Sequence, residues 1–351
     1  MIMTGTLDPH PFRPLRILLP GGSGLIGHLL ARRFLERGHQ VTVLTRAPYT
    51  APWLTVRWDG EHPGPWIDHL EGSDVCINLT GRSINCRHNT GNRRSIYESR
   101  IGSTRLLGQA IAALNQPPRL WMNASAATIY PRLSDENGVD LPLDETTPAM
   151  DGRLSSEQAG PDTASRSTSP RWTERRDFSR RVVRDWEAEF FAAETPRTRK
   201  IALRTAVVLS PVPSSAFAVL SRLVRAGLGG TQGNGRQFVP WIHAADYASA
   251  VEFLMAREDL DGPFNLAAPN PLPNRQFMAA LREAWEMPNG LPAPRLAIEI
   301  GAFFLRTAPE LVLGSCRAVP GRLVEAGFAF AFPFWPDAAQ DLVQQWRHRN
   351  D

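Results

Sequence analysis

Residues 15–27 read Leu15-Arg16-Ile17-Leu18-Leu19-Pro20-Gly21-Gly22-Ser23-Gly24-Leu25-Ile26-Gly27. The apolar run at the start predicts a buried strand, and the glycines that follow predict a tight turn. Residues 28–37 then repeat apolar side chains at helical spacing, and Gly38 ends that helix. Apolar residues return at 41–46 as a second strand. The order of strand, glycine turn, helix and strand is one βαβ unit.

The same alternation continues along the chain. Further strands are predicted at 75–79, 120–125 and 201–209, and long helices at 92–113 and 177–193. Strands that alternate with helices form a parallel sheet with helices on both faces. We therefore expect an α/β fold, a Rossmann-type doubly wound parallel sheet of about seven strands, with a smaller C-terminal α/β lobe.

The composition is that of an ordinary globular protein, with 42% hydrophobic and 21% charged residues among 351 and a net charge of +4. No apolar run approaches the roughly 20 residues of a membrane-spanning helix. Three scattered cysteines suit neither a disulfide framework nor a zinc site, so we expect a cytoplasmic protein without metal. Lys200 is the only lysine. The arginines are spread along the chain, which argues against a nucleic-acid partner. The one local cluster, at 175–184, leaves nucleic-acid binding as an alternative.

The glycine turn predicts a dinucleotide site. Gly21, Gly24 and Gly27 have the spacing G-x-x-G-x-x-G between a strand and a helix. Glycines at these positions permit the tight turn, and the N–H groups of the helix N-terminus then face the pyrophosphate. We expect the intervening Ser23, Leu25 and Ile26 to line the same site.

The second strand indicates which cofactor binds. A site for NAD usually offers an acid about 20 residues after the glycines, to hold the ribose 2′-hydroxyl. Here the strand ends in Thr45 and Arg46. Arg46 would pair with a 2′-phosphate and Thr45 could donate a further hydrogen bond, which predicts NADP. The alternative for Arg46 is a solvated loop arginine.

These predictions divide the chain. Residues 1–14 form a flexible leader rich in proline. Residues 15–210 form the NADP-binding Rossmann domain, interrupted by a polar surface insertion at 132–172. Residues 211–351 form a substrate lobe, from which about 241–268 returns to the main sheet.

Several motifs together resemble the extended short-chain dehydrogenase/reductases, and within them an atypical, nucleotide-sugar epimerase-like subgroup with a C-terminal domain of unknown function. The resemblance covers most of residues 15–345 outside the insertion. Its motifs are Gly21–Gly27, Ile77–Gly81, Ser99–Arg105, Leu203–Leu209, Gly233–Gln237, Trp241–Asp246, Asn265–Asn270 and Pro320–Phe328.

The resemblance implies further cofactor contacts. The loop after the strand at 75–79 borders the cofactor in that family. It therefore places Asn78, Leu79, Thr80 and Gly81 at the cofactor, together with Arg100 on the next helix. We add Ala124, which lies in the neighbouring strand.

The family's usual catalytic pair is absent. That pair is a tyrosine, the general acid/base, with a lysine four residues later. Phe178 and Val182 stand at the expected positions, and none of the four tyrosines has a lysine four residues on. Ser125 and Tyr130, near the end of a predicted strand, are our catalytic candidates. The same predicted helix carries three arginines that could replace the lysine in holding the cofactor ribose, or could form a solvated face: Arg180, Arg181 and Arg184.

Two other features have simpler explanations. His243 and Asp246 could form a hydrolytic triad with Ser125, but the matching family segment is a structural turn. Glu187 is expected on a helix surface or at a helix cap.

The sequence therefore predicts an NADP-binding oxidoreductase or epimerase-like enzyme that acts on a small carbonyl or sugar-like substrate. The alternative is a non-catalytic NADP(H)-binding regulator or scaffold, because the tyrosine–lysine pair is missing. The expected partner is a small-molecule substrate. The sequence leaves a homodimer open.

Overall fold

A computed structural model describes residues 13–84, 86, 89–148, 170–294, 298 and 314–350. Most of the predicted leader (1–12) and the middle of the predicted insertion (149–169) lie outside the described residues.

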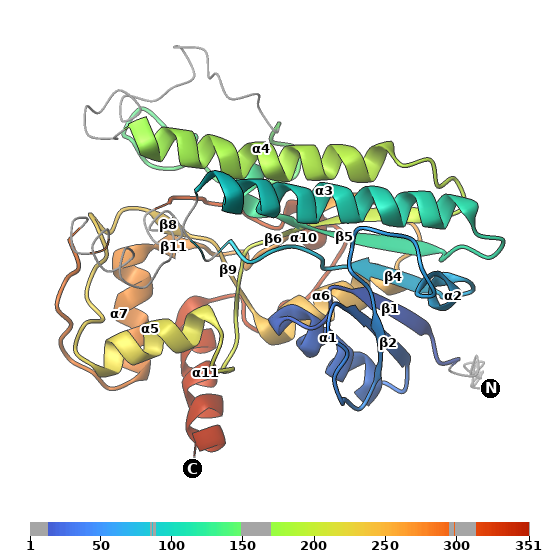
Figure 1. The fold of residues 1–351 in the computed structure, drawn as a ribbon. Helices are drawn as coiled ribbons and strands as arrows, with labels where there is room; N and C mark the ends of the chain where they lie inside the picture. Colours follow the sequence, from blue (N-terminus) through green and yellow to red (C-terminus); the bar gives the residue numbers. More distant parts are fainter. Residues whose placement is uncertain are drawn as a thin grey trace, which may run out of the picture.

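The described chain forms a central parallel sheet of seven strands in the order β10-β6-β5-β4-β1-β2-β3 (Figure 1). This order places β1 and β4 side by side at the middle, where the chain changes direction across the sheet. The strands are β1 (Arg16–Pro20), β2 (Gln40–Thr45), β3 (Leu54–Arg57), β4 (Val75–Asn78), β5 (Leu120–Ala126), β6 (Arg199–Thr205) and β10 (Gly262–Leu266).

Helices cover both faces of the sheet. In Figure 1, α3 and α4 run side by side over one face, while α1 and α6 lie on the other. Side chains alternate accordingly: Leu18 and Trp121 pack in the core with α3 and α4, and Leu19 and Met122 pack in the core with α1 and α6. The bounds are α1 (Leu25–Glu36), α2 (Ile67–Leu70), α3 (Thr90–Ala113), the short 3₁₀ helix η1 (Ala127–Ile129), α4 (Pro170–Ala192) and α6 (Ala244–Ala256).

The C-terminal part is mainly helical and has its own core. Trp335 stacks on Phe277 with ring centroids 4.1 Å apart and meets Trp241 edge-on at 5.2 Å. This part also contains two short two-stranded sheets, in which β7 pairs with β9 and β8 pairs with β11. Its elements are β7 (Val207–Leu209), α5 (Ala216–Arg225), β8 (Phe238–Val239), β9 (Trp241–His243), β11 (Leu272–Pro273), α7 (Asn274–Ala284), α10 (Gly321–Glu325) and α11 (Trp335–Asn350).

The predicted doubly wound fold is confirmed, with two differences in its strands. The strand predicted at 201–209 is broken at Ala206, whose N–H bonds to Leu266 O, while the N–H of Val207 bonds to Pro240 O. The chain therefore leaves the main sheet after β6 and joins β9 as β7. The edge strand β3 was not predicted, because its four residues are partly or fully exposed and carry no long apolar run.

No helix in the described part of the chain has the length and apolar character needed to cross a membrane.

Candidate functional site

The glycine turn lies at the carboxyl end of β1, against β4. Gly21 has φ +72°, and a Cβ there would lie 2.6 Å from Thr80 Cα. A Cβ on Gly27 would clash with the carbonyl oxygen of Gly22. Both glycines therefore let the backbone fold closely on itself where α1 begins.

Gly24 differs from these two. It is the N-cap of α1, no side chain caps the helix there, and a Cβ on Gly24 would meet nothing within 4 Å. The first N–H groups of an α-helix have no partner within the helix. Open space in front of such N–H groups fits the pyrophosphate of a dinucleotide. Ser23 beside it is exposed, and Leu25 and Ile26 are half-buried.

The loop after β4 forms the neighbouring wall. Asn78 is fully buried; its amide donates to Asn123 Oδ1 (2.7 Å) and Thr104 Oγ1 (3.2 Å), and its Oδ1 accepts from the Thr80 N–H (3.1 Å). Asn78 therefore shapes the loop from beneath. The Thr80 hydroxyl oxygen lies beside Gly21 and is buried without a hydrogen-bond partner in the part of the chain that the structure describes. A buried hydroxyl without a partner is uncommon and suits a ligand contact. Leu79 is half-buried and packs against the core.

Arg100 packs on this loop. A Cβ on Gly81 would lie 3.0 Å from Arg100 Cζ. The guanidinium lies 5.2 Å from the Trp186 ring and donates to the carbonyls of Arg82 and Ile96. Burial lowers the pKa of Arg100 to about 10, still well above neutral. Arg100 is thus a half-buried cation held by neutral groups.

The end of β2 carries the residues expected at a 2′-phosphate. Thr45 is buried, and Arg46 is exposed and forms no ion pair with any described residue. The loop that follows is anchored to α1, because Tyr49 stacks on His28 with ring centroids 5.5 Å apart. The Arg46 side chain is therefore available to an anion beside the glycine turn.

A polar network lies between β5, β6 and α4. Glu187 and Arg204 are both about 8% exposed and form a bidentate ion pair (2.9 and 2.8 Å). Ser125 donates to Glu187 Oε1 (2.5 Å). Arg204 also donates to the Tyr130 hydroxyl (3.0 Å), which donates to Asn265 Oδ1 (2.7 Å). The expectation that Glu187 is a surface or capping acid is wrong.

The direction of each hydrogen bond in this network follows from its members. Arginine can only donate and an ionised carboxylate can only accept, so Ser125 must give its proton to Glu187. Burial raises the pKa of Tyr130 to about 12, although Arg204 acts in the opposite direction. Burial alone would lower the pKa of Arg204, but hydrogen bonds and charge from Glu187 raise it overall. The network therefore holds a stable charge pair at neutral pH.

The two catalytic candidates are thus both bound within the protein. Ser125 and Asn123 point to the α3/α4 face of β5, and Ala124 between them points to the other face. Tyr130 is 4% exposed, with its hydroxyl over the ends of β6 and β10. Either hydroxyl would have to exchange a buried hydrogen bond to reach a ligand.

Phe178 and Val182 are buried together with Ile96 at the contact between α3 and α4. They add apolar packing where the resemblance expects a tyrosine and a lysine. The single lysine does not substitute, because Lys200 lies at the amino end of β6 and donates to carbonyls at and just after the end of α4, including Phe191 O and Ala193 O. Among the described residues, no tyrosine–lysine pair forms.

The arginines of α4 and the pair His243 and Asp246 each make their own contacts. Arg180 donates from Nε to Tyr130 O (3.2 Å), Arg181 lies over the Phe178 ring, and Arg184 contacts Asp185. His243 caps α6, where its Nδ1 accepts from the Ala245 N–H. Asp246 accepts from the N–H groups of Ala331 and Phe332. His243 and Asp246 are therefore structural, and Ser125 is bonded to Glu187 instead.

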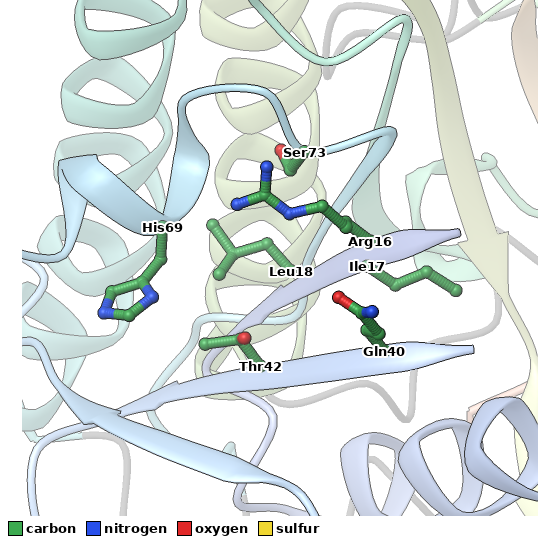
Figure 2. Close-up of a pocket in the computed structure, with 7 residues that line it drawn as sticks. All are labelled: Arg16, Ile17, Leu18, Gln40, Thr42, His69 and Ser73. Carbon is green, nitrogen blue, oxygen red and sulfur yellow. The ribbon is translucent and has the colours of Figure 1, made fainter. Parts of the chain in front are cut away.

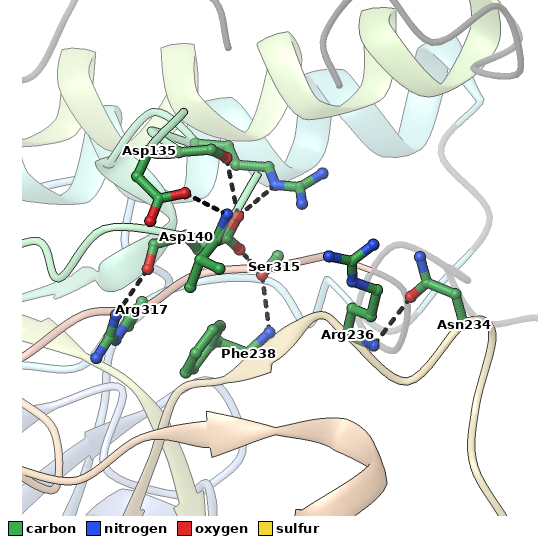
Figure 3. A network of polar contacts seen from close by, with 10 residues as sticks. Asp135, Asp140, Asn234, Arg236, Phe238, Ser315 and Arg317 are labelled. Atoms are coloured by element: carbon green, nitrogen blue, oxygen red, sulfur yellow. Dashed lines mark hydrogen bonds and ion pairs between the residues drawn. The ribbon is translucent and has the colours of Figure 1, made fainter. Parts of the chain in front are cut away.

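The described part of the predicted insertion is tied to the C-terminal part. Asp140 is buried and accepts from Arg132 Nε and Ser315 Oγ, while Arg317 donates to its carbonyl (Figure 3). Glu145 accepts from the N–H groups of Asn265 (2.6 Å) and Arg322 (3.1 Å). These contacts cross the edge of the sheet between the two parts of the chain.

A small cavity lies at the amino-terminal ends of the sheet strands, away from the glycine turn (Figure 2). Its volume is about 40 Å³, and it lies between the amino ends of β1 and β2, beside Arg16, Gln40 and His69. A space of this size holds a few water molecules but no dinucleotide. In the described ranges, no group of three His, Cys, Asp or Glu side chains is arranged to hold a metal.

Sequence reasoning missed Glu187, Arg204 and Glu145. Arg204 carried a signal, because it is a charged residue inside an apolar run that predicts a buried strand. A buried charge calls for a partner of opposite sign, but the sequence does not say which acid supplies it.

Comparison with known proteins adds to this geometry. The sequence profile described as "NAD dependent epimerase/dehydratase family" matches residues 17–267, and "Domain of unknown function (DUF1731)" matches 293–342. The bovine (Bos taurus) "Epimerase family protein SDR39U1" is 30% identical over 336 residues, which cover 94% of this chain and 100% of the relative.

Two solved structures are similar over most of the chain. The human epimerase family protein SDR39U1 (isoform2), crystallised with NADPH, is 26% identical with a TM-score of 0.75 and covers 93% of this chain and 99% of that one. The nucleoside-diphosphate sugar epimerase from Corynebacterium glutamicum is 26% identical with a TM-score of 0.67, over 95% of this chain and 59% of that one.

Proposed function

Because the chain belongs to the NAD dependent epimerase/dehydratase family, we propose that it binds NADP(H) and acts as an oxidoreductase or epimerase-like enzyme on a small carbonyl or sugar-like substrate. The resemblance to epimerase-like proteins with a C-terminal domain of unknown function is confirmed by the two profile matches. The similar human protein was crystallised with NADPH.

The observation that carries the proposal is the open N-terminus of α1. A Cβ on Gly24, at the start of α1, would lie in open space, and the Thr80 hydroxyl beside Gly21 has no hydrogen-bond partner among the described residues. In this proposal α1 binds the pyrophosphate, Thr45 and Arg46 bind the 2′-phosphate, and Thr80, Gly81 and Arg100 border the rest of the cofactor. When bound, the nicotinamide would supply or accept a hydride.

The chain's own part in the reaction is to orient the substrate and hold protons. Ser125 and Tyr130 remain our candidates for the substrate end of the site. Each is fixed by the Glu187–Arg204 pair, so each would act only while exchanging a buried hydrogen bond. This arrangement favours positioning over rapid proton transfer.

The test is a fluorescence titration of the protein with NADPH and with NADH. We expect tighter binding of NADPH and a loss of that preference in Arg46→Ala, because a charge-assisted hydrogen bond to the 2′-phosphate is removed. Equal binding of both cofactors would contradict the choice of NADP, and binding of neither would contradict the whole proposal.

One observation favours a second function, that of an NADP(H)-binding regulator or scaffold without turnover. Phe178 and Val182 occupy the positions of the catalytic pair and pack into the core. This alternative predicts NADPH binding without NADPH consumption across a panel of aldehydes, ketones and sugar nucleotides. Consumption with any of them would exclude it.

A further inference from the structure

Helix α4 faces the sheet with a stripe of residues three or four apart. Phe190 meets Trp121 edge-on at 4.6 Å, Glu187 pairs with Arg204, and Val183 packs on η1. The next residue of this stripe is Arg180, about 10 Å from Glu187 along the axis at 1.5 Å per residue. Because β5 ends at Ala126, Arg180 lies beyond the carboxyl end of that strand.

The guanidinium of Arg180 is oriented but not saturated. Its Nε donates to the carbonyl of Tyr130 at 3.2 Å. Its two terminal nitrogens donate to no residue that the structure describes. By contrast, Arg204 uses all three of its guanidinium nitrogens on Glu187 and Tyr130. Among the described residues, Arg180 is therefore a fixed cation whose outer donors have no acceptor.

Its surroundings do not compensate the charge. Burial lowers the pKa of the Arg180 guanidinium, and the opposing attraction of Asp177 and Cys316 is through space, without an ion pair among the described residues. A half-buried cation without an acid partner costs stability unless an anion binds it. Cys316, from the C-terminal part, donates to Ala127 O in η1. This brings the C-terminal part against the same strand end.

We propose that the terminal nitrogens of Arg180 bind an oxyanion, a carboxylate or phosphate carried by the substrate. In open α/β sheets, ligands bind beyond the carboxyl ends of the strands, and the planar guanidinium fork matches both oxyanions. The proposal rests on the proposed function and narrows its substrate class to small carbonyl or sugar-like compounds with an anionic group.

The experiment compares matched ligand pairs by calorimetric titration of protein saturated with NADPH, so that the cofactor's own phosphates are already bound. The pairs are dihydroxyacetone phosphate with dihydroxyacetone, and pyruvate with acetone. We expect the anionic member of at least one pair to bind about tenfold or more tightly than its neutral partner. Which pair shows the larger difference distinguishes phosphate from carboxylate.

Arg180→Gln should abolish this difference, because glutamine can still donate to Tyr130 O but carries no charge. Arg181→Gln is the matched control, since Arg181 is the exposed neighbour on the same helix and should leave the difference unchanged. Arg180→Lys should retain part of it. No preference for anionic members, or a preference that survives Arg180→Gln, would overturn the proposal.

A separate experiment without cofactor distinguishes a failure of the Arg180 site from a failure of the proposed NADP(H) site. Inorganic phosphate and acetate are titrated into cofactor-free wild type, Arg180→Gln and Arg46→Ala. Oxyanion binding that Arg180→Gln removes and Arg46→Ala retains supports the Arg180 site, even if NADPH does not bind. Binding removed only by Arg46→Ala assigns the anion to the cofactor site and contradicts the proposal.

Discussion

The glycine turn after β1 and the polar network beneath α4 lie on the same edge of the sheet, but the protein satisfies their polar groups to different extents. At the turn, a Cβ on Gly24 would meet nothing within 4 Å, and among the described residues the Thr80 hydroxyl has no hydrogen-bond partner and Arg46 has no acid partner. In the network, Ser125, Glu187 and Arg204 are all bonded to one another or to neighbours. A region built for a ligand leaves donors free, whereas a region built for rigidity uses them internally.

The strongest test of this contrast removes the acid of the network. Glu187→Ala leaves Arg204 buried without its partner, and we expect a loss of about 3–5 kcal/mol in the free energy of unfolding. Denaturant unfolding measures it. The control is Glu189→Ala, which breaks an exposed pair with Arg105 and should cost about 0–1 kcal/mol. Equal losses in the two variants would show that the buried Glu187–Arg204 pair contributes no more to stability than the exposed Arg105–Glu189 pair.

A smaller effect is expected at Tyr130. Tyr130→Phe leaves Arg204 Nη1 and Asn265 Oδ1 without that hydroxyl, and should cost about 1–3 kcal/mol. If Tyr130 is only structural, NADPH affinity should stay unchanged. A large loss of turnover with little loss of stability would instead identify it as catalytic.

The pH dependence of the same variant has a defined sign. The folded-state pKa of Tyr130 is raised to about 12, above its unfolded value near 10. Because the folded state holds the Tyr130 proton more tightly than the unfolded state does, protonated Tyr130 stabilises the fold. This contribution to the free energy of unfolding is fully present below pH 10 and is lost as the pH rises towards 12. The stability difference between wild type and Tyr130→Phe should therefore shrink across that range. A difference that does not change with pH would contradict the assignment.

The smallest effect on stability is expected at the turn. Gly24→Ala adds a methyl group to open space, so the free energy of unfolding should change by only about 0.5 kcal/mol. NADPH affinity should fall about tenfold, because the methyl group occupies the ligand's space. Gly102→Ala, at another open glycine on α3, should leave affinity unchanged. Unaltered NADPH affinity in Gly24→Ala would contradict the placement of the cofactor at the N-terminus of α1.

The sequence predicted the parts of this molecule that depend on local pattern. The apolar runs and glycine spacing predicted β1, α1 and β2 within a few residues. They did not predict the break at Ala206, because that break depends on hydrogen bonds to Leu266 and Pro240, far along the chain.

The residues of the candidate site also fall into those that a local pattern predicts and those that it does not. Gly24 and Arg46 were found from local spacing, and their role stays a prediction until cofactor binding is measured. The Glu187–Arg204 pair was missed, because it joins a helix and a strand whose relative register no local pattern fixes. Residues that meet only through tertiary packing are the ones that single-sequence reasoning does not locate.

Glu145 has a consequence for how the molecule is made. Its carboxylate accepts from the backbone of Asn265 and Arg322, 120 and 177 residues further along the chain. During synthesis the βαβ unit can fold as it emerges, but this tie cannot close until residue 322 has left the ribosome. The edge of the sheet near Tyr130 and Asn265 is therefore completed late, and nascent chains should protect β1 and β2 from proteolysis well before they protect β10.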